Sequence, residues 1–521
     1  MNLTRALGSV GGLTLASRVL GLVRDSLFAR FIGASFASDA FLIAFRLPNM
    51  FRALFAEGAF SAAFIPMFNR KMAEDEEGSL VKGVSFAEDA LSVLLPILIV
   101  MTVVMELAAY PVTWALSGGF NGISTAEFEF AVELSRITFP YLLLISLVSL
   151  LGGILNSLHR FWINAAAPIL LNATLIAALL FFHTNPLGTA RNQAIAVTLS
   201  GVLQLLWLIW ACRSAGVKLK LKRPRLNPDV KRLLSLIWPA AAGAGAVQIN
   251  LVISTALAAS LLPEGSVSYI YYADRLNQLP LGLIGIGLGT VLLPTISRQL
   301  GKGHEAEAME TQNRGMELAL FFTLPATVAL IVCGVPIISA LFQHGAFTSA
   351  DTLATAGALA AFSIGLPAYI LVKVLTPGFY ARSDTKTPVR FATIAIGINL
   401  ILNLAFIVPL QHLGPPLATA LASCVNVVLL YLALKKRGHF VADLRLRHRA
   451  IRLLGAALVM GIAMYFLDDL FTPYTTGPSL TRWAAMFILV GTGGLVYAVA
   501  CFVLRAYRPA DLRALLRRKP V

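Results

Sequence analysis

Residues 18–70 read RVLGLVRDSLFARFIGASFASDAFLIAFRLPNMFRALFAEGAFSAAFIPMFNR. Their apolar content is that of two membrane-spanning helices, each of which needs about 20 apolar residues. An ionised side chain near the bilayer centre costs roughly 2.5–3.5 kcal/mol, so charges persist there only when they face water or one another. The stretch therefore predicts the wall of a polar, mainly cationic cavity in a membrane protein. Its membrane-depth charges are Arg18, Arg24, Asp25, Asp39, Arg46, Arg52 and Glu57.

Composition places the whole chain in the membrane class. Of its 521 residues, 57% are hydrophobic and only 13% are charged, against about 25% charged in soluble domains. The net charge of +16 lies mostly between apolar runs. That pattern favours positive-inside topology and contact with anionic membrane lipids over nucleic-acid binding. The four cysteines lie far apart without metal or redox spacing, so no metal and no cofactor is expected.

Apolar runs of about 20 residues recur along the chain and predict an all-α integral membrane protein with about fourteen transmembrane helices. The N-terminus lacks the pattern of a cleaved signal peptide and is interpreted as the first helix, over 8–32. Lys and Arg gather in alternate loops, while the opposite loops nearly lack them. This asymmetry predicts a multi-pass protein with both termini in the cytoplasm.

The sequence also repeats. Arg46-Leu47 corresponds to Arg275-Leu276, FPYLLLISLVSLLGGILNS (139–157) to LPAYILVKVLTPGFYARSD (366–384), and Asn172 to Asn399, at offsets of 227 to 229 residues. Two parallel-repeat lobes of six helices are expected, with the substrate site at their interface. The expected division is 1–216 (helices 1–6), 217–438 (helices 7–12) and 439–521 (two C-terminal helices and a basic cytoplasmic tail).

The chemistry of the cavity is read from its arginines. Asp39, Arg46 and Asn49 share a helix face, and Pro48 predicts a kink. The alternative is that the charges pair off structurally, for example Arg24 with Asp39. Among the membrane-depth charges of this stretch, four arginines meet only three carboxylates, and Arg275 adds a further guanidinium. This excess favours a phosphate-bearing anion, which arginine binds bidentately.

Other membrane-depth polar groups have more than one interpretation. Lys373 could line the cavity or pair with a carbonyl, and the two readings are equally favoured. Asn399 and Asn403 are weak candidates for a cation site, and interhelical hydrogen bonds are the preferred interpretation. The sequence contains no nucleotide-binding loop or catalytic metal motif, which argues against an enzyme.

Several long motifs resemble one family. They are RVLGLVRDSLFARFIGAS (18–35), FRLPNMFRALFAEGAFSAAFIPMF (45–68), YYADRLNQLPLGLIGIGLGTVLLP (271–294), LFQHGAFTSADT (341–352) and KVLTPGFYARSDTKTPV (373–389). These resemble the MurJ (MviN) family of bacterial lipid II flippases, in the multidrug/oligosaccharidyl-lipid/polysaccharide exporter superfamily. The resemblance implies a protein of the bacterial inner membrane with two six-helix lobes forming a V. It also implies alternating access and a groove for the polyprenyl tail that the last two helices shape.

The resemblance also implies roles for residues. Arg18, Arg24, Arg52 and Arg275 fall on its cavity arginines and are the predicted substrate-binding set. Asp39 falls on an important acidic position and Ala29 on a cavity-lining one. The remaining cavity or gating candidates are Asp25, Arg46, Asn49, Glu57 and Lys373. Some family members carry acidic sodium ligands in the eleventh helix, where this chain has Asn399 and Asn403, so sodium coupling is not expected here.

The predicted function is lipid II translocation from the cytoplasmic to the periplasmic leaflet, dependent on membrane potential, by a monomer. The predicted partners are lipid II, membrane lipids and proteins of cell-wall synthesis, and not nucleic acid. A flippase for another polyprenyl-diphosphate-linked glycan remains an alternative, because the diphosphate chemistry would be the same. A cation-coupled drug antiporter is less favoured, since its cavity would be rich in carboxylates and aromatic residues.

Overall fold

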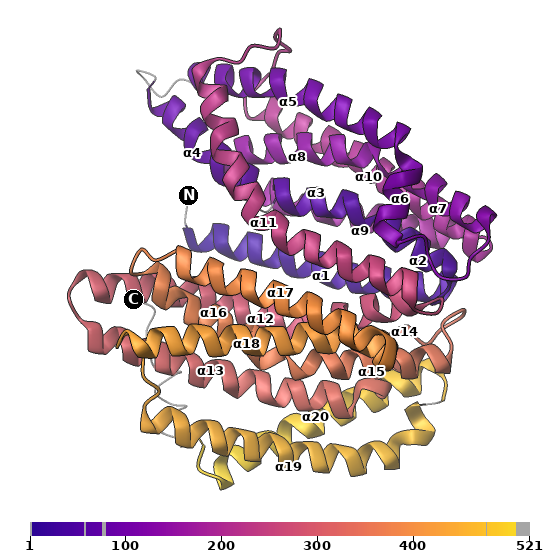
Figure 1. Ribbon diagram of the computed structural model, residues 1–521, viewed down its shortest axis with the longest axis vertical. Helices are drawn as coiled ribbons and strands as arrows, with labels where there is room; N and C mark the ends of the chain where they lie inside the picture. Colours follow the sequence, from indigo (N-terminus) through magenta and orange to yellow (C-terminus); the bar gives the residue numbers. More distant parts are fainter. Residues whose placement is uncertain (1–2, 57–58, 75–79, 476, 507–521) are drawn as a thin grey trace. The chain divides into compact units, whose positions relative to one another are not determined.

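The computed structural model describes residues 3–56, 59–74, 80–475 and 477–506. All regular elements within these ranges are helices. The chain divides into two compact units, residues 1–268 (unit 1) and 269–521 (unit 2). Figure 1 shows the helices of each unit running as packed rods.

The helices of unit 1 are α1 (Leu3–Ile32), α2 (Phe36–Ala44), α3 (Arg46–Ala56), α4 (Ala59–Ala73), α5 (Val81–Leu107), α6 (Ala109–Ser117), α7 (Thr125–Thr138), α8 (Pro140–Ser157), α9 (Phe161–Phe181), α10 (Pro186–Ser214) and α11 (Pro228–Leu261). Helix α12 (Ser266–Gly301) begins in the last residues of unit 1 and continues into unit 2. The others in unit 2 are α13 (Glu305–Val332), α14 (Gly334–Phe342), α15 (Ser349–Ile364), α16 (Leu366–Tyr380), α17 (Lys386–Leu410), η1 (Gln411–Leu413), α18 (Gly414–Lys436), α19 (Leu444–Thr475) and α20 (Ser479–Val503).

The helices carry the surface expected in lipid. Ten helical segments of the described chain are long and apolar enough to cross a membrane. Large apolar side chains are outward-facing on them, such as Phe181 at 77% and Leu283 at 78% exposure. The predicted all-helical membrane fold is confirmed by these helices. A helix suits a bilayer because it satisfies its backbone polar groups internally. The count of fourteen transmembrane helices stays a prediction, since α1, which carries several charged residues, is not among the ten apolar segments.

The predicted internal repeat is visible in the order of elements. A long helix followed by a nine-residue helix occurs twice, as α5–α6 and α13–α14. A break before a proline occurs twice as well, between α7 and α8 and between α15 and α16. Even the caps correspond: Ser124 with Glu127 and Thr348 with Asp351 form capping boxes at α7 and α15.

The second predicted span, over residues 38–66, is not one continuous helix, because α2 ends at Ala44 and α3 begins at Arg46. The break lies at Phe45, three residues before Pro48. Pro48 has no N–H to donate to the carbonyl of Ala44, and the hydroxyl of Thr138 on α7 donates to that carbonyl instead, at 2.9 Å. The break follows from the proline, and Phe45 at the break keeps right-handed helical angles (φ −82°, ψ −9°). The shared face of Asp39, Arg46 and Asn49 stays a prediction.

The predicted three-part division stays a prediction. Within unit 1, α11 packs against α4 and α6. Within unit 2, the hairpin of α19 and α20 packs on α13 (Figure 1). A cluster of buried side chains joins them, including Cys333, Met460 and Leu489. The basic tail predicted beyond residue 506 lies outside the described residues.

Candidate functional site

Asp39 joins the start of α2 to the start of α12. Its carboxylate accepts the backbone N–H of Gly265 at 2.8 Å and that of Ser268 at 2.9 Å. The hydroxyl of Ser268 adds a third hydrogen bond at 2.5 Å. Asp39 is only 4% exposed. A carboxylate at a helix N-terminus satisfies orphan N–H groups and complements the helix dipole.

The arrangement is reciprocal. Glu264, just before α12, accepts the backbone N–H of Phe36 at the first position of α2, at 2.5 Å. Each helix start is thus capped by a carboxylate from the other segment. The hydroxyls of Ser38 and Ser268 also lie 2.6 Å apart. Sequence reasoning found Asp39 but missed Glu264, although an acidic residue just before a predicted helix was a usable signal.

Arg24 lies in a buried polar cluster on α1. Its Nε and Nη2 donate to Asp25 Oδ1 at 3.0 and 2.6 Å, and its Nη1 donates to the side-chain oxygen of Asn172 on α9 at 3.1 Å. Asn172 in turn donates to the carbonyl of Ser17 at 3.0 Å. The suggested Arg24–Asp39 pair is therefore absent. Asp25 is the carboxylate partner of Arg24, and Asn172 fixes the direction of the Arg24 guanidinium.

The other cationic candidates of unit 1 have different surroundings. Arg18 on α1 is exposed. Arg46 reaches α11, donating to Thr255 Oγ1 at 2.9 Å and to the carbonyl of Leu251 at 3.2 Å. Arg52 donates to Asn49 Oδ1 at 3.0 Å on α3, as their spacing of three residues allows.

Two further cavity candidates come out differently. Ala29 is fully buried, and its role as a cavity-lining residue stays a prediction. Glu57 lies outside the described residues.

Arg275, on α12 in unit 2, is held by Tyr271 one turn earlier. Its Nε and Nη2 lie 3.3 and 3.2 Å from the phenol oxygen, and its guanidinium carbon is 5.4 Å from the ring centre. Adjacent Asp274 accepts from Gln278 at 2.5 Å. Tyr271 thus orients the guanidinium without neutralising it, a contribution that the sequence interpretation missed.

Lys373 on α16 is exposed and lies along α12 at Gly285. A Cβ on Gly285 would lie 3.0 Å from the Lys373 amine nitrogen, so the glycine makes room for the lysine. Asn399 donates to Thr419 Oγ1 on α18 at 3.2 Å, which agrees with the preferred interhelical hydrogen bond. In the described part of the chain, no three His, Cys, Asp or Glu side chains gather as a metal site.

Comparison with known proteins gives one consistent family. The sequence model described as "Lipid II flippase MurJ" matches residues 28–484. A probable lipid II flippase MurJ of Rhizobium tropici is 41% identical, over 100% of this chain and 97% of the relative. The lipid II flippase MurJ of Burkholderia cenocepacia is 38% identical over 89% of this chain and 90% of its own length.

Solved structures agree. A lipid II flippase MurJ in an inward closed conformation has a TM-score of 0.79 at 26% identity, covering 98% of this chain and 99% of that one. An inward-facing multidrug resistance MATE family transporter of the MOP superfamily shares the fold, with a TM-score of 0.65 at 17% identity, over 81% of this chain and 94% of its own. The match of the family's sequence model over most of the chain, with relatives above 30% identity along their full length, means that the chain belongs to the lipid II flippase MurJ family.

Proposed function

We propose that this chain translocates lipid II, a polyprenyl diphosphate carrying a disaccharide-pentapeptide, from the cytoplasmic to the periplasmic leaflet of the inner membrane. The observation that carries the proposal is the family match along the whole chain. The proposed activity is transport by alternating access and not catalysis. The protein is proposed to act as a monomer with both termini in the cytoplasm, in contact with membrane lipids and proteins of cell-wall synthesis.

Arg24 and Arg52 are proposed to bind the substrate diphosphate, with Arg18 deeper in the path and Arg275 as a further guanidinium. The geometry of Arg24 supports this role. Asp25 and Asn172 hold its planar group in one orientation, and a fixed fork loses less conformational freedom when it meets two phosphate oxygens. The diphosphate would compete with Asp25 for the guanidinium, so binding and release can be balanced against an internal anion.

Asp39 is proposed as a gating residue. Its three hydrogen bonds to Gly265 and Ser268 hold the start of α12 against α2. Opening at this point would strand a buried carboxylate and two backbone N–H groups without partners, which is costly. The reciprocal cap therefore favours the state in which these two segments are joined.

The test is replacement of a bacterium's own essential lipid II flippase by this chain, with lipid II accessibility measured on the outer leaflet. Growth with normal outer-leaflet lipid II is the expected result. A chain that is inserted and abundant yet leaves lipid II in the inner leaflet would overturn the proposal. Restored export of a different polyprenyl-linked glycan alone would assign the substrate to that glycan.

A further inference from the structure

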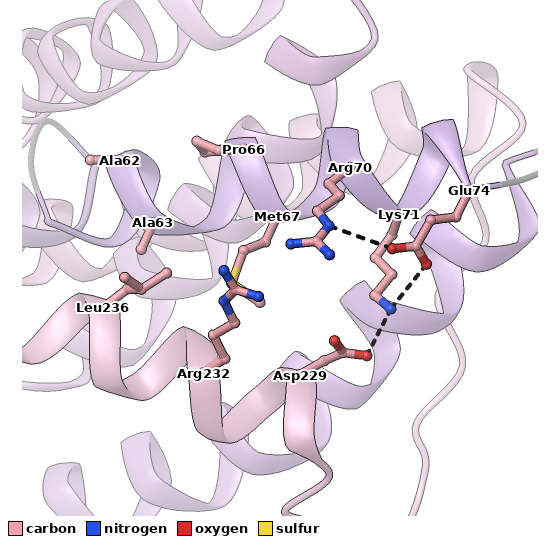
Figure 2. A pocket seen from close by; sticks show the side chains of 10 residues that line it. All are labelled: Ala62, Ala63, Pro66, Met67, Arg70, Lys71, Glu74, Asp229, Arg232 and Leu236. Atoms are coloured by element: carbon pink, nitrogen blue, oxygen red, sulfur yellow. Dashed lines mark hydrogen bonds and ion pairs between the residues drawn. The ribbon is translucent and has the colours of Figure 1, made fainter.

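A cavity of about 390 Å³ lies between α4 and the start of α11, within unit 1 (Figure 2). Its size falls within the range of about 300–1,000 Å³ that is common for small-molecule sites. On α4 the lining residues recur every three to four positions, so they form one face of the helix. The lining consists of Ala62, Ala63, Pro66, Met67, Arg70, Lys71, Glu74, Asp229, Arg232 and Leu236.

The lining changes character along its length. Ala62, Ala63, Pro66, Met67 and Leu236 are apolar, and the charged residues all stand at one end. Such a gradient matches a membrane lipid, which has an apolar chain at one end and a polar headgroup at the other. Arg70 and Lys71 in the last turn of α4, together with the basic segment that precedes α11, place the charged end at the membrane surface on the predicted cytoplasmic side.

The charges at that end are not balanced. The amine of Lys71 lies 3.1 Å from Glu74 and 3.0 Å from Asp229, so it engages both carboxylates of the lining. These two ion pairs raise the pKa of Lys71, that with Asp229 most, and keep it charged. Arg70 has only a 3.6 Å contact with Glu74, and its side chain is 64% exposed. The basic side chains of the lining therefore outnumber its carboxylates by one.

Arg232 supplies that excess. It makes no ion pair with any residue in the described part of the chain. Figure 2 shows its guanidinium and that of Arg70 pointing into the cavity from opposite helices. Two like charges that converge repel each other unless an anion lies between them. Guanidinium groups match phosphate oxygens in charge and geometry.

We propose that this cavity binds an anionic glycerophospholipid of the cytoplasmic leaflet, with its phosphate between Arg70 and Arg232 and its glycerol and first chain carbons against Pro66, Met67 and Leu236. The bound phosphate would join α4 to α11, in parallel with the Lys71–Asp229 ion pair. This ligand is distinct from the transported substrate, and the inference does not depend on the proposed function.

The test uses the purified full chain in nanodiscs of phosphatidylcholine, with or without phosphatidylglycerol. Phosphatidylglycerol should be retained in native mass spectra and should raise the unfolding temperature. The double variant R70Q/R232Q should weaken its apparent affinity by about tenfold, since two phosphate contacts are lost. The matched control is R213Q, which removes an exposed arginine at the end of α10, outside the cavity lining. Equal retention by R70Q/R232Q and R213Q would overturn the proposal.

Further arms separate the possible anions. A62L fills the apolar side at an exposed position and should weaken phospholipid binding while leaving glycerophosphate binding unchanged. A stabilisation by inorganic phosphate equal to that by the phospholipid would overturn the assignment to a lipid. Preferential retention of undecaprenyl diphosphate would also overturn it. Destabilisation of R70Q/R232Q in phosphatidylcholine alone would assign the arginines to an anion within the chain and would end the proposal.

Discussion

One carboxylate oxygen of Asp39 accepts both the backbone N–H and the hydroxyl of Ser268, at 2.9 and 2.5 Å. The other oxygen accepts the N–H of Gly265 at 2.8 Å. The buried carboxyl group of Asp39 is thus surrounded by donors at the start of α12. Hydrogen bonds to charged groups contribute more than neutral ones, at about 1.5–3 kcal/mol each against about 1.

We expect D39N to destabilise the folded protein by about 1.5–3 kcal/mol, because the amide loses the charge and turns an NH₂ group toward an N–H donor. S268A removes only the hydroxyl and should cost about 1 kcal/mol. Thermal unfolding in one detergent measures both. An unfolding temperature for D39N equal to that of S268A would show that the carboxylate charge is not needed here.

Removing Arg24 should abolish translocation. R24A alone would strip Asp25 of its guanidinium, so R24A/D25N is the better test: it removes both charges and keeps the cluster neutral. Transport should be lost in both variants, and R24K should recover only part, since an amine cannot reproduce the fork. Outer-leaflet lipid II is the readout, with R213A as the control. Normal transport by a folded R24A/D25N would remove Arg24 from the proposed binding set.

Tyr271 should matter less than the arginine it positions. R275A should abolish transport, whereas Y271F keeps the ring under the guanidinium and loses only the phenol oxygen at 3.2–3.3 Å. We expect Y271F to lower the rate by about tenfold to a hundredfold, as for loss of one charge-assisted hydrogen bond of about 1.5–3 kcal/mol. A rate for Y271F as low as that for R275A would mean that the tyrosine itself contacts the substrate.

Translocation should depend on membrane potential. Each elementary charge moved through 100 mV is worth about 2.3 kcal/mol, and outward movement of an anionic headgroup runs downhill when the interior is negative. In proteoliposomes, flipping should quicken with an interior-negative potential and slow when the potential is reversed. Equal flipping rates at an interior-negative, a reversed and a collapsed potential would contradict the proposed coupling to membrane potential.

The Asp384–Arg437 pair should make the corner between α16 and α17 sensitive to acid. Asp384 accepts one hydrogen bond from Arg437 at 2.6 Å and another from the backbone N–H of Thr387 at 3.0 Å. These bonds hold the pKa of Asp384 well below its ordinary value of 3.8. A lowered folded-state pKa gives stability above the unfolded pKa that is lost as the pH falls through the folded one.

D384N should therefore unfold at a lower temperature than the native protein at neutral pH, and the gap should narrow only below pH 3.8. Hydrogen exchange of residues 381–387 in the native protein and the variant checks the same sign locally. A gap that closes already between neutral pH and pH 5 would show that another group is responsible.

The sequence alone determined the class of fold and predicted the chemistry of the site. Apolar runs can be satisfied in lipid only as helices, so hydropathy suffices to predict an all-helical membrane protein. The excess of arginine at membrane depth predicted an anionic ligand without coordinates, because buried charge is too costly to be accidental. Pro48 predicted a kink in the second span, but the sequence did not show that Thr138, which is distant in sequence, donates to the Ala44 carbonyl that the proline leaves without a donor.

The partners of those charges were decided only by the tertiary structure. Nothing in the local sequence indicates that Arg24 is oriented by Asn172, 148 residues away, or that Asp39 caps a helix that begins at Ser266. Hydrogen bonds of about 3 Å depend on how helices pack, and packing is fixed by contacts between residues far apart in the chain. Periodicity predicts which residues share a helix face, but the residues that this face contacts are determined only by the tertiary structure.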